Sequence, residues 1–170
     1  MTLRLIAGTA HRALAEAIAA AAGCGLTPCE VDRFPDGELR PAVESVRGDD
    51  VYVIQPTGPP ANEHLVELLF LLDACRRAGA GRITAVVPYL GYARQDRRVR
   101  RGGAVGARVV ADVLVTAGAQ RLVVVDPHTT ALEAMSSVPV EMLTAVPVLA
   151  RALESMVADD AVVVAPTSAR

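Results

Sequence analysis

Short runs of β-branched and other apolar residues recur along this chain, and a segment of helical pattern follows most of them. The clearest run, residues 83–87 (Ile-Thr-Ala-Val-Val), predicts a buried strand that Pro88 closes. The same patterns predict strands at residues 3–8, 29–34, 38–43, 51–54, 122–125, 140–143 and 161–165, and helices at 10–22, 61–78, 104–116 and 146–157. Strands that alternate with helices are typical of stacked βαβ units. We therefore expect an α/β fold: a mainly parallel sheet flanked by helices, with a small hairpin excursion near residues 30–45.

Size and composition limit the possibilities further. A chain of 170 residues predicts a single domain. Its formal charge of -2 gives no overall sign of nucleic-acid binding, and no apolar stretch is long enough to predict a membrane span. The three cysteines, Cys24, Cys29 and Cys75, are odd in number and are expected to be small buried residues in a reducing compartment, although Cys24 and Cys29 could also form a metal pair. The cytoplasm is the expected location.

An arginine-rich stretch follows the strand at residues 83–87. Five of the eight positions from Arg94 to Arg101 are arginine, Asp96 is the one carboxylate among them, and two glycines follow. Arginine presents a planar fork of donors that fits phosphate oxygens, and open α/β sheets bind ligands at the carboxyl ends of their strands. The stretch is therefore a candidate polyanion site; the alternatives are a solvated basic loop or a loop that contacts RNA.

Other candidate residues lie in loops and turns. Asp126 and His128 follow a predicted strand and are suited to a metal or a metal-bound phosphate, or else to a helix cap and an ordinary polar loop. Phe34 stands directly before a Pro-Asp-Gly turn, where it could stack on a base or pack into the core. Ser45 and Arg47 could hold an anion or simply occupy a turn. The chain has no lysine and no phosphate-binding glycine-lysine loop.

The first and second predicted helices carry two further expectations. Thr9 precedes the first and is expected to cap it. The second, at residues 61–78, is apolar well beyond one stripe, which predicts that it is covered on two sides, by its own sheet and by another helix or subunit. We therefore expect a homo-oligomer.

Several motifs together resemble the N-terminal half of ribose-phosphate diphosphokinase (phosphoribosyl pyrophosphate synthase). The similarity extends over nearly the whole chain, and the Tyr-Ala-Arg-Gln-Asp run is its most specific part. The motifs are Phe34-Pro35-Asp36-Gly37-Glu38, Glu44-Ser45-Val46-Arg47-Gly48, Glu67-Leu68-Leu69, residues 82–89, residues 91–97 and Asp126-Pro127-His128.

The resemblance implies a phosphoribosyltransferase-like fold and transfer of the diphosphoryl group of ATP to ribose 5-phosphate, with Mg²⁺ as the cofactor. It implies that Arg94, Gln95 and Asp96 bind ATP, and that His128 lies beside the metal and phosphates. It further implies that three residues of the hairpin, Phe34, Asp36 and Glu38, reach the nucleotide of a neighbouring subunit. It also implies that Ser45 and Arg47 form part of a regulatory anion site. No catalytic residue is identified in this chain.

The sequence also departs from the family. We expect the second domain of the family to be absent from this chain. Thr167 stands where an acidic loop is expected, and residues 103–108 lack the serine and lysine typical of the helix there. We therefore expect the chain alone to be incomplete for catalysis; the alternative is a non-catalytic nucleotide-binding or regulatory subunit of such an enzyme.

Overall fold

The computed structural model describes residues 1–154, 156–157, 161–162 and 164. Its central sheet has five parallel strands in the order β1-β4-β5-β6-β7. These strands are β1 (Leu3–Ala7), β4 (Asp50–Ile54), β5 (Arg82–Val87), β6 (Arg121–Val125) and β7 (Val140–Leu143). The fold class predicted from the sequence is confirmed.

The hairpin excursion is also confirmed. Strands β2 (Cys29–Arg33) and β3 (Leu39–Val43) pair antiparallel and form a separate two-stranded sheet. Gly37 has a φ of 94° in the turn between them, a conformation that glycine adopts without steric cost. The hairpin packs on α2 through β3, and Arg33 pairs with Glu63 of that helix.

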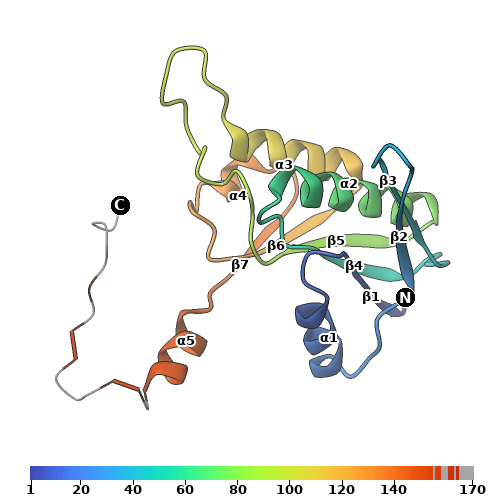
Figure 1. Ribbon diagram of the computed structural model, residues 1–170, viewed down its shortest axis with the longest axis horizontal. Coiled ribbons are helices and arrows are strands. Elements are labelled where there is room, and N and C mark those ends of the chain that lie inside the picture. Colours follow the sequence, from blue (N-terminus) through green and yellow to red (C-terminus); the bar gives the residue numbers. More distant parts are fainter. Residues whose placement is uncertain (155, 158–160, 163, 165–170) are drawn as a thin grey trace.

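Helices cover the two faces of the central sheet unequally. Helices α2 (Ala61–Arg77) and α3 (Gly106–Ala117) cover one face, and α1 (Arg12–Ala21) covers the other at β1 and β4 (Figure 1). The larger core lies under α2 and α3, where Leu68, Leu71 and Leu114 are fully buried. Burying each such side chain contributes about 1.5–3 kcal/mol, so these leucines fix the two helices on the sheet.

The final part of the described chain is less packed. Helix α4 (Leu132–Met135) is a single turn, and α5 (Val146–Leu153) ends four residues before the predicted boundary. All eight residues of α5 are described, and none is buried; Figure 1 shows the helix apart from the sheet. The predicted strand at 161–165 falls partly, and Thr167 wholly, outside the described residues. No helix in the described part of the chain is long and apolar enough to cross a membrane.

The expected role of Thr9 is wrong. His11 caps α1 instead, since its Nδ1 accepts a hydrogen bond from the Leu14 amide at 3.1 Å. Thr9 is directed to α2, where its amide and its hydroxyl donate to the two carboxylate oxygens of Glu67 at 2.7 and 2.6 Å. Glu67 is 1% exposed, so this buried carboxylate ties the β1–α1 loop to α2.

The prediction that α2 is covered by its own sheet and by another helix is confirmed within one chain. Leu68, Leu71 and Leu72 face the sheet and α3, as expected. Val66 and Phe70, one turn apart, remain 40% and 45% exposed on the outer side. The outer side of α2 therefore keeps an apolar pair that the described residues of the chain cover only in part.

Replacement of Glu67 by glutamine tests the role of the buried carboxylate. The amide keeps the size of the side chain, but its NH₂ group cannot accept from Thr9, so one charge-assisted hydrogen bond is lost at a buried position. We expect the free energy of unfolding, measured by urea denaturation, to fall by about 2 kcal/mol. Glu16→Gln is the matched control: its exposed pair with Arg12 predicts a change below about 0.5 kcal/mol. Equal effects of the two variants would contradict this role.

Candidate functional site

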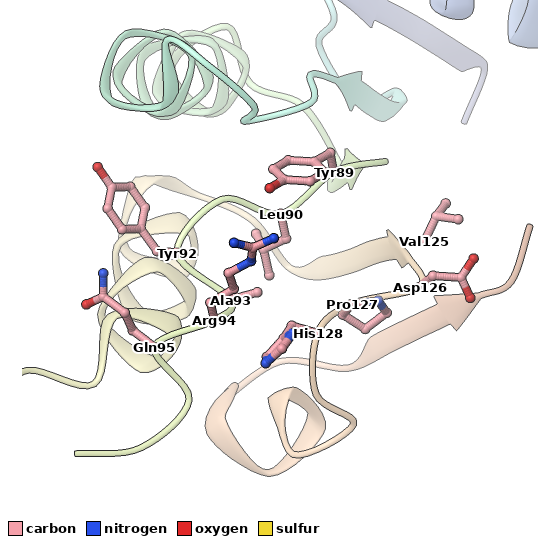
Figure 2. Close-up of a pocket in the computed structure, with 10 residues that line it drawn as sticks. All are labelled: Tyr89, Leu90, Tyr92, Ala93, Arg94, Gln95, Val125, Asp126, Pro127 and His128. Carbon is pink, nitrogen blue, oxygen red and sulfur yellow. The ribbon is translucent and has the colours of Figure 1, made fainter. Parts of the chain in front are cut away.

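A cavity of about 380 Å³ lies at the carboxyl ends of β5 and β6. Ten residues line it, nine from the two loops that follow these strands and Val125 from the end of β6 (Figure 2): Tyr89, Leu90, Tyr92, Ala93, Arg94, Gln95, Val125, Asp126, Pro127 and His128. The parallel register explains why they meet, because Val87 of β5 pairs with Val124 of β6 and both loops leave the sheet at the same edge. The structure thus brings together four of the predicted candidates, Arg94, Gln95, Asp126 and His128.

The strand preceding each loop fixes where the loop begins. Val87 and Val124 are buried against α2 and α3, and Leu90 and Ala93 in the first loop are buried in the same core. Between and beyond these apolar anchors, Tyr89, Arg94 and His128 are exposed. The alternation of buried and exposed residues therefore turns the polar groups toward the cavity region while the backbone stays attached to the core.

Two residues of the cavity wall have unusual backbone conformations. Tyr92 has a φ of 62° and Asp126 a φ of 42°, and they are the only non-glycine residues with positive φ in the described part of the chain. A bulky side chain rarely adopts this conformation, which costs about 1–3 kcal/mol unless the surroundings enforce it. Such residues cluster at functional sites. Tyr89 and Tyr92 belong to the motifs of the sequence, but neither was predicted to be a site residue.

The charge of the site comes from the arginine-rich stretch. None of the ion pairs between described residues involves the five arginines from Arg94 to Arg101, whereas nine other arginines are paired with carboxylates. Arg94 is exposed at the cavity, and four further arginines follow it in the same loop. This concentration of positive charge, without neutralising carboxylates bound to it, favours an anionic ligand.

Asp126 makes a contact that the sequence did not suggest. Its Oδ2 accepts a hydrogen bond from the amide of Ala145 at 2.8 Å, and Figure 2 shows its carboxylate directed away from Arg94 and His128. It is not the N-cap residue of either following helix, since Ala131 occupies that position in α4 and Ala145 in α5. The hydrogen bond from Ala145, together with one from the Thr144 side chain, lowers the pKa of Asp126. Asp126 therefore joins the β6 loop to the end of β7.

The neighbours of Arg94 in the sequence take different positions. Gln95 lies against the start of α3, where a Cβ on Gly106 would be 2.8 Å from its Oε1. Its backbone carbonyl accepts from the Ala107 amide at 3.1 Å, which fixes the loop to the helix. Asp96 is half-buried and does not line the cavity.

The hairpin candidates lie elsewhere. Phe34, Asp36 and Glu38 are exposed at the tip of β2–β3, and none of them lines the cavity of the same chain. Phe34 is 43% exposed, with the Arg40 guanidinium 5.2 Å from its ring centre, so the alternative that it packs into the core is wrong. Asp36 Oδ1 accepts from the Glu38 amide at 3.1 Å and closes the turn.

Ser45 and Arg47 are exposed between β3 and β4 and do not line this cavity either. The Arg47 side chain lies along Gly79, where a Cβ would be 3.4 Å from its Nη1. The two residues therefore belong to the opposite edge of the sheet, near the start of β5 rather than its end.

No cluster of three or more metal-ligating side chains occurs among the described residues. The alternative of a metal pair at Cys24 and Cys29 lacks support, because burial, and then the charge of Glu67, raises the pKa of Cys29 to about 11. Burial favours the neutral thiol, so forming the thiolate that binds a metal costs more here than at an exposed cysteine. Only Cys75 is fully buried; Cys24 and Cys29 are partly exposed, contrary to expectation, and all three are free thiols.

The lowered pKa of Asp126 gives a testable pH dependence. Because the folded-state pKa lies below its ordinary value of about 3.9, the contact with Ala145 stabilises the protein above that pH and is lost as pH falls through the folded pKa. We expect NMR titration to place the Asp126 carboxyl below about 3.9. Thr144→Val should move it upward, and the control Thr130→Val should leave it unchanged. An Asp126 titration at or above the ordinary value would contradict the contact.

Comparison with known proteins gives the family. A family model described as the N-terminal domain of ribose phosphate pyrophosphokinase matches residues 3–118. The ribose-phosphate pyrophosphokinase of Bacillus caldolyticus is 46% identical over 165 residues, which are 96% of this chain and 52% of that protein. Ribose-phosphate pyrophosphokinase 1 of Spinacia oleracea is 46% identical over 167 residues, covering 96% of this chain and 50% of that protein.

A solved structure agrees. The crystal structure of phosphoribosylpyrophosphate synthetase from Mycobacterium smegmatis superimposes with a TM-score of 0.87 at 39% identity, over 91% of this chain and 52% of that one. The chain thus spans about half the length of the curated relatives it matches. On the family model, the sequence identities and the shared fold, this chain belongs to the ribose-phosphate pyrophosphokinase family and corresponds to its N-terminal half.

Proposed function

We propose that this chain supplies the nucleotide-binding half of a ribose-phosphate pyrophosphokinase, which transfers the diphosphoryl group of ATP to ribose 5-phosphate in nucleotide biosynthesis. One observation carries the proposal. The cavity at the ends of β5 and β6 places exposed Arg94 and His128 beside an arginine cluster, in a chain whose formal charge is -2. The ligand that this arrangement fits is a polyphosphate.

The chemistry of diphosphoryl transfer fits such a site. The reaction needs charge neutralisation and alignment more than covalent help, and fixed positive groups in a cavity provide both. Arg94 would bind phosphate oxygens through its guanidinium fork, and His128 would bind the same chain of phosphates from the β6 side. Gln95, fixed against α3, and Asp96 would complete the ATP contacts.

The side chains available near the cavity also limit how Mg²⁺ could be bound there. Mg²⁺ prefers oxygen ligands and is usually bound by one or two protein groups together with substrate phosphates. The described residues offer no three-ligand cluster, and Asp126 already binds the Ala145 amide through one oxygen. The residues present therefore fit an ion carried by the nucleotide, with His128 beside it, and such an ion would neutralise phosphate charge.

The exposed hairpin tip supports a site completed by a second copy of the chain. Phe34 offers an apolar ring to a base, and Asp36 and Glu38 offer acceptors to ribose hydroxyls or a base amino group, yet none of them lies in the cavity of its own chain. We propose that they contact the nucleotide of a neighbouring subunit. Ser45 and Arg47, at the opposite sheet edge, are proposed as part of a separate regulatory anion site.

A second candidate function is a non-catalytic nucleotide-binding or regulatory subunit. The observation in its favour is that Arg94 and His128 at the cavity offer groups for binding phosphate oxygens, which a binding subunit also needs. The two functions differ in one assay, formation of phosphoribosyl pyrophosphate from ATP, Mg²⁺ and ribose 5-phosphate. We expect the 170-residue chain to bind ATP and to form no product alone.

Calorimetric titration of ATP with magnesium into the purified chain tests the site. We expect Arg94→Ala to weaken binding about tenfold or more, since a charge-assisted hydrogen bond contributes about 1.5–3 kcal/mol. Arg100→Ala is the matched control: it removes the same charge from the same loop, at a residue that does not line the cavity. Equal losses would mean that the loop is a general basic patch and would overturn the assignment of Arg94.

Association of two copies of the chain can be tested at the outer side of α2. Val66 and Phe70 form an exposed apolar pair on this helix, and a second copy would bury them. We expect light scattering at micromolar concentration to give a mass above that of one chain, and Phe70→Glu to lower it. The control is Val99→Glu, at an exposed apolar residue of the arginine loop. A single-chain mass for the unmodified protein would count against assembly.

A further inference from the structure

We propose that Thr57 is a positioning residue for the nucleotide site, and that it acts by holding the start of the arginine loop in its binding geometry. This inference rests on the proposed function, because the site that Thr57 would position is the proposed nucleotide site. Thr57 itself does not line the cavity. Thr57 lies in the segment between β4 and α2, and it is 1% exposed.

The hydroxyl of Thr57 uses both of its hydrogen-bonding capacities on the neighbouring loop. It donates to the carbonyl of Tyr89 at 3.1 Å and accepts from the amide of Gly91 at 2.8 Å. The Thr57 amide donates to the same Tyr89 carbonyl at 2.8 Å. One buried side chain therefore satisfies polar groups on both sides of Leu90, at the point where the loop leaves β5.

The approach of the two segments is as close as a glycine permits. A Cβ on Gly91 would lie 2.5 Å from the carbonyl oxygen of Thr57, so any other residue would push the loop away. The next residue, Tyr92, has its positive φ, and its hydroxyl is bonded to Asn62 at the start of α2. The segment from Thr57 to Asn62 thus holds the loop at two successive points.

Hydrogen bonds hold the backbone on both sides of Arg94. Before it, the Tyr92 carbonyl accepts from the Gln95 amide at 2.9 Å, and after it the Gln95 carbonyl is bonded to Ala107 of α3. The backbone that carries the Arg94 guanidinium is consequently set by contacts that begin at Thr57. A loop that is already ordered loses less entropy when a ligand binds, so loss of these contacts should weaken binding although Thr57 does not line the cavity.

Three variants separate positioning from a general effect on stability. Thr57→Val keeps the size and β-branching but makes neither hydrogen bond, Thr57→Ser keeps the hydroxyl, and Thr116→Val removes a hydroxyl that is bonded only within α3. The first readout uses no nucleotide: trypsin cleaves after arginine, so the rate of cleavage within residues 94–101 reports how firmly the loop is held. The second is calorimetric affinity for ATP with magnesium. Circular dichroism establishes that each variant is folded.

We expect Thr57→Val to be cleaved in this loop several times faster and to bind ATP about tenfold more weakly, while Thr57→Ser and Thr116→Val stay close to the unmodified chain. If Thr57→Val does not fold, Gly91→Ala, which displaces the same contact from the other side, is measured instead. Unchanged cleavage and affinity in the variant, or losses in Thr57→Ser as large as in Thr57→Val, would overturn the role of Thr57 alone. Absence of ATP binding by the unmodified chain would overturn the proposed function and the role of Thr57 with it.

Discussion

The parallel pairing of β4, β5 and β6 is the constraint on which the rest of the molecule depends. Ile54 pairs with Val86, and Val87 with Val124, so the three strands end together. The loops that follow them therefore leave the sheet side by side, and one of them can hold another. Without this register, Arg94 and His128, which are 34 positions apart in the sequence, would share no cavity.

Buried polar contacts then convert neighbouring loops into a fixed arrangement. Thr9 and Glu67 join the β1 loop to α2, and Thr57 joins the β4 loop to the arginine loop. Each contact satisfies groups that would cost about 1–3 kcal/mol if they were buried without partners. Gln55, fully buried beside them, accepts from the Ala10 amide through its Oε1. The loops at the carboxyl edge are therefore part of the packed structure, although they contain no regular strand or helix.

The arginines differ in whether a carboxylate is bound to them. Arginines outside the loop are largely paired with carboxylates, whereas none of the ion pairs between described residues involves those from Arg94 to Arg101. Among the described residues, most arginines without a carboxylate partner therefore lie in this one loop, at the carboxyl edge of the sheet. This edge suits the polyphosphate ligand proposed for the site, since arginine guanidinium groups bind phosphate oxygens.

The sequence by itself determined the alternating strands and helices, the hairpin and the place of the arginine loop after β5, because each depends on residues close together in the chain. It also indicated Arg94, Gln95 and His128 through short motifs. Only the tertiary structure decided that Thr9 binds Glu67, 58 positions away, instead of capping α1, and that Thr57 binds Gly91 across 34 positions. It also decided that Asp126 binds the Ala145 amide and that Tyr92 takes a left-handed conformation. Local pattern cannot predict such contacts, since they follow from which segments the packed sheet and helices bring within hydrogen-bonding distance.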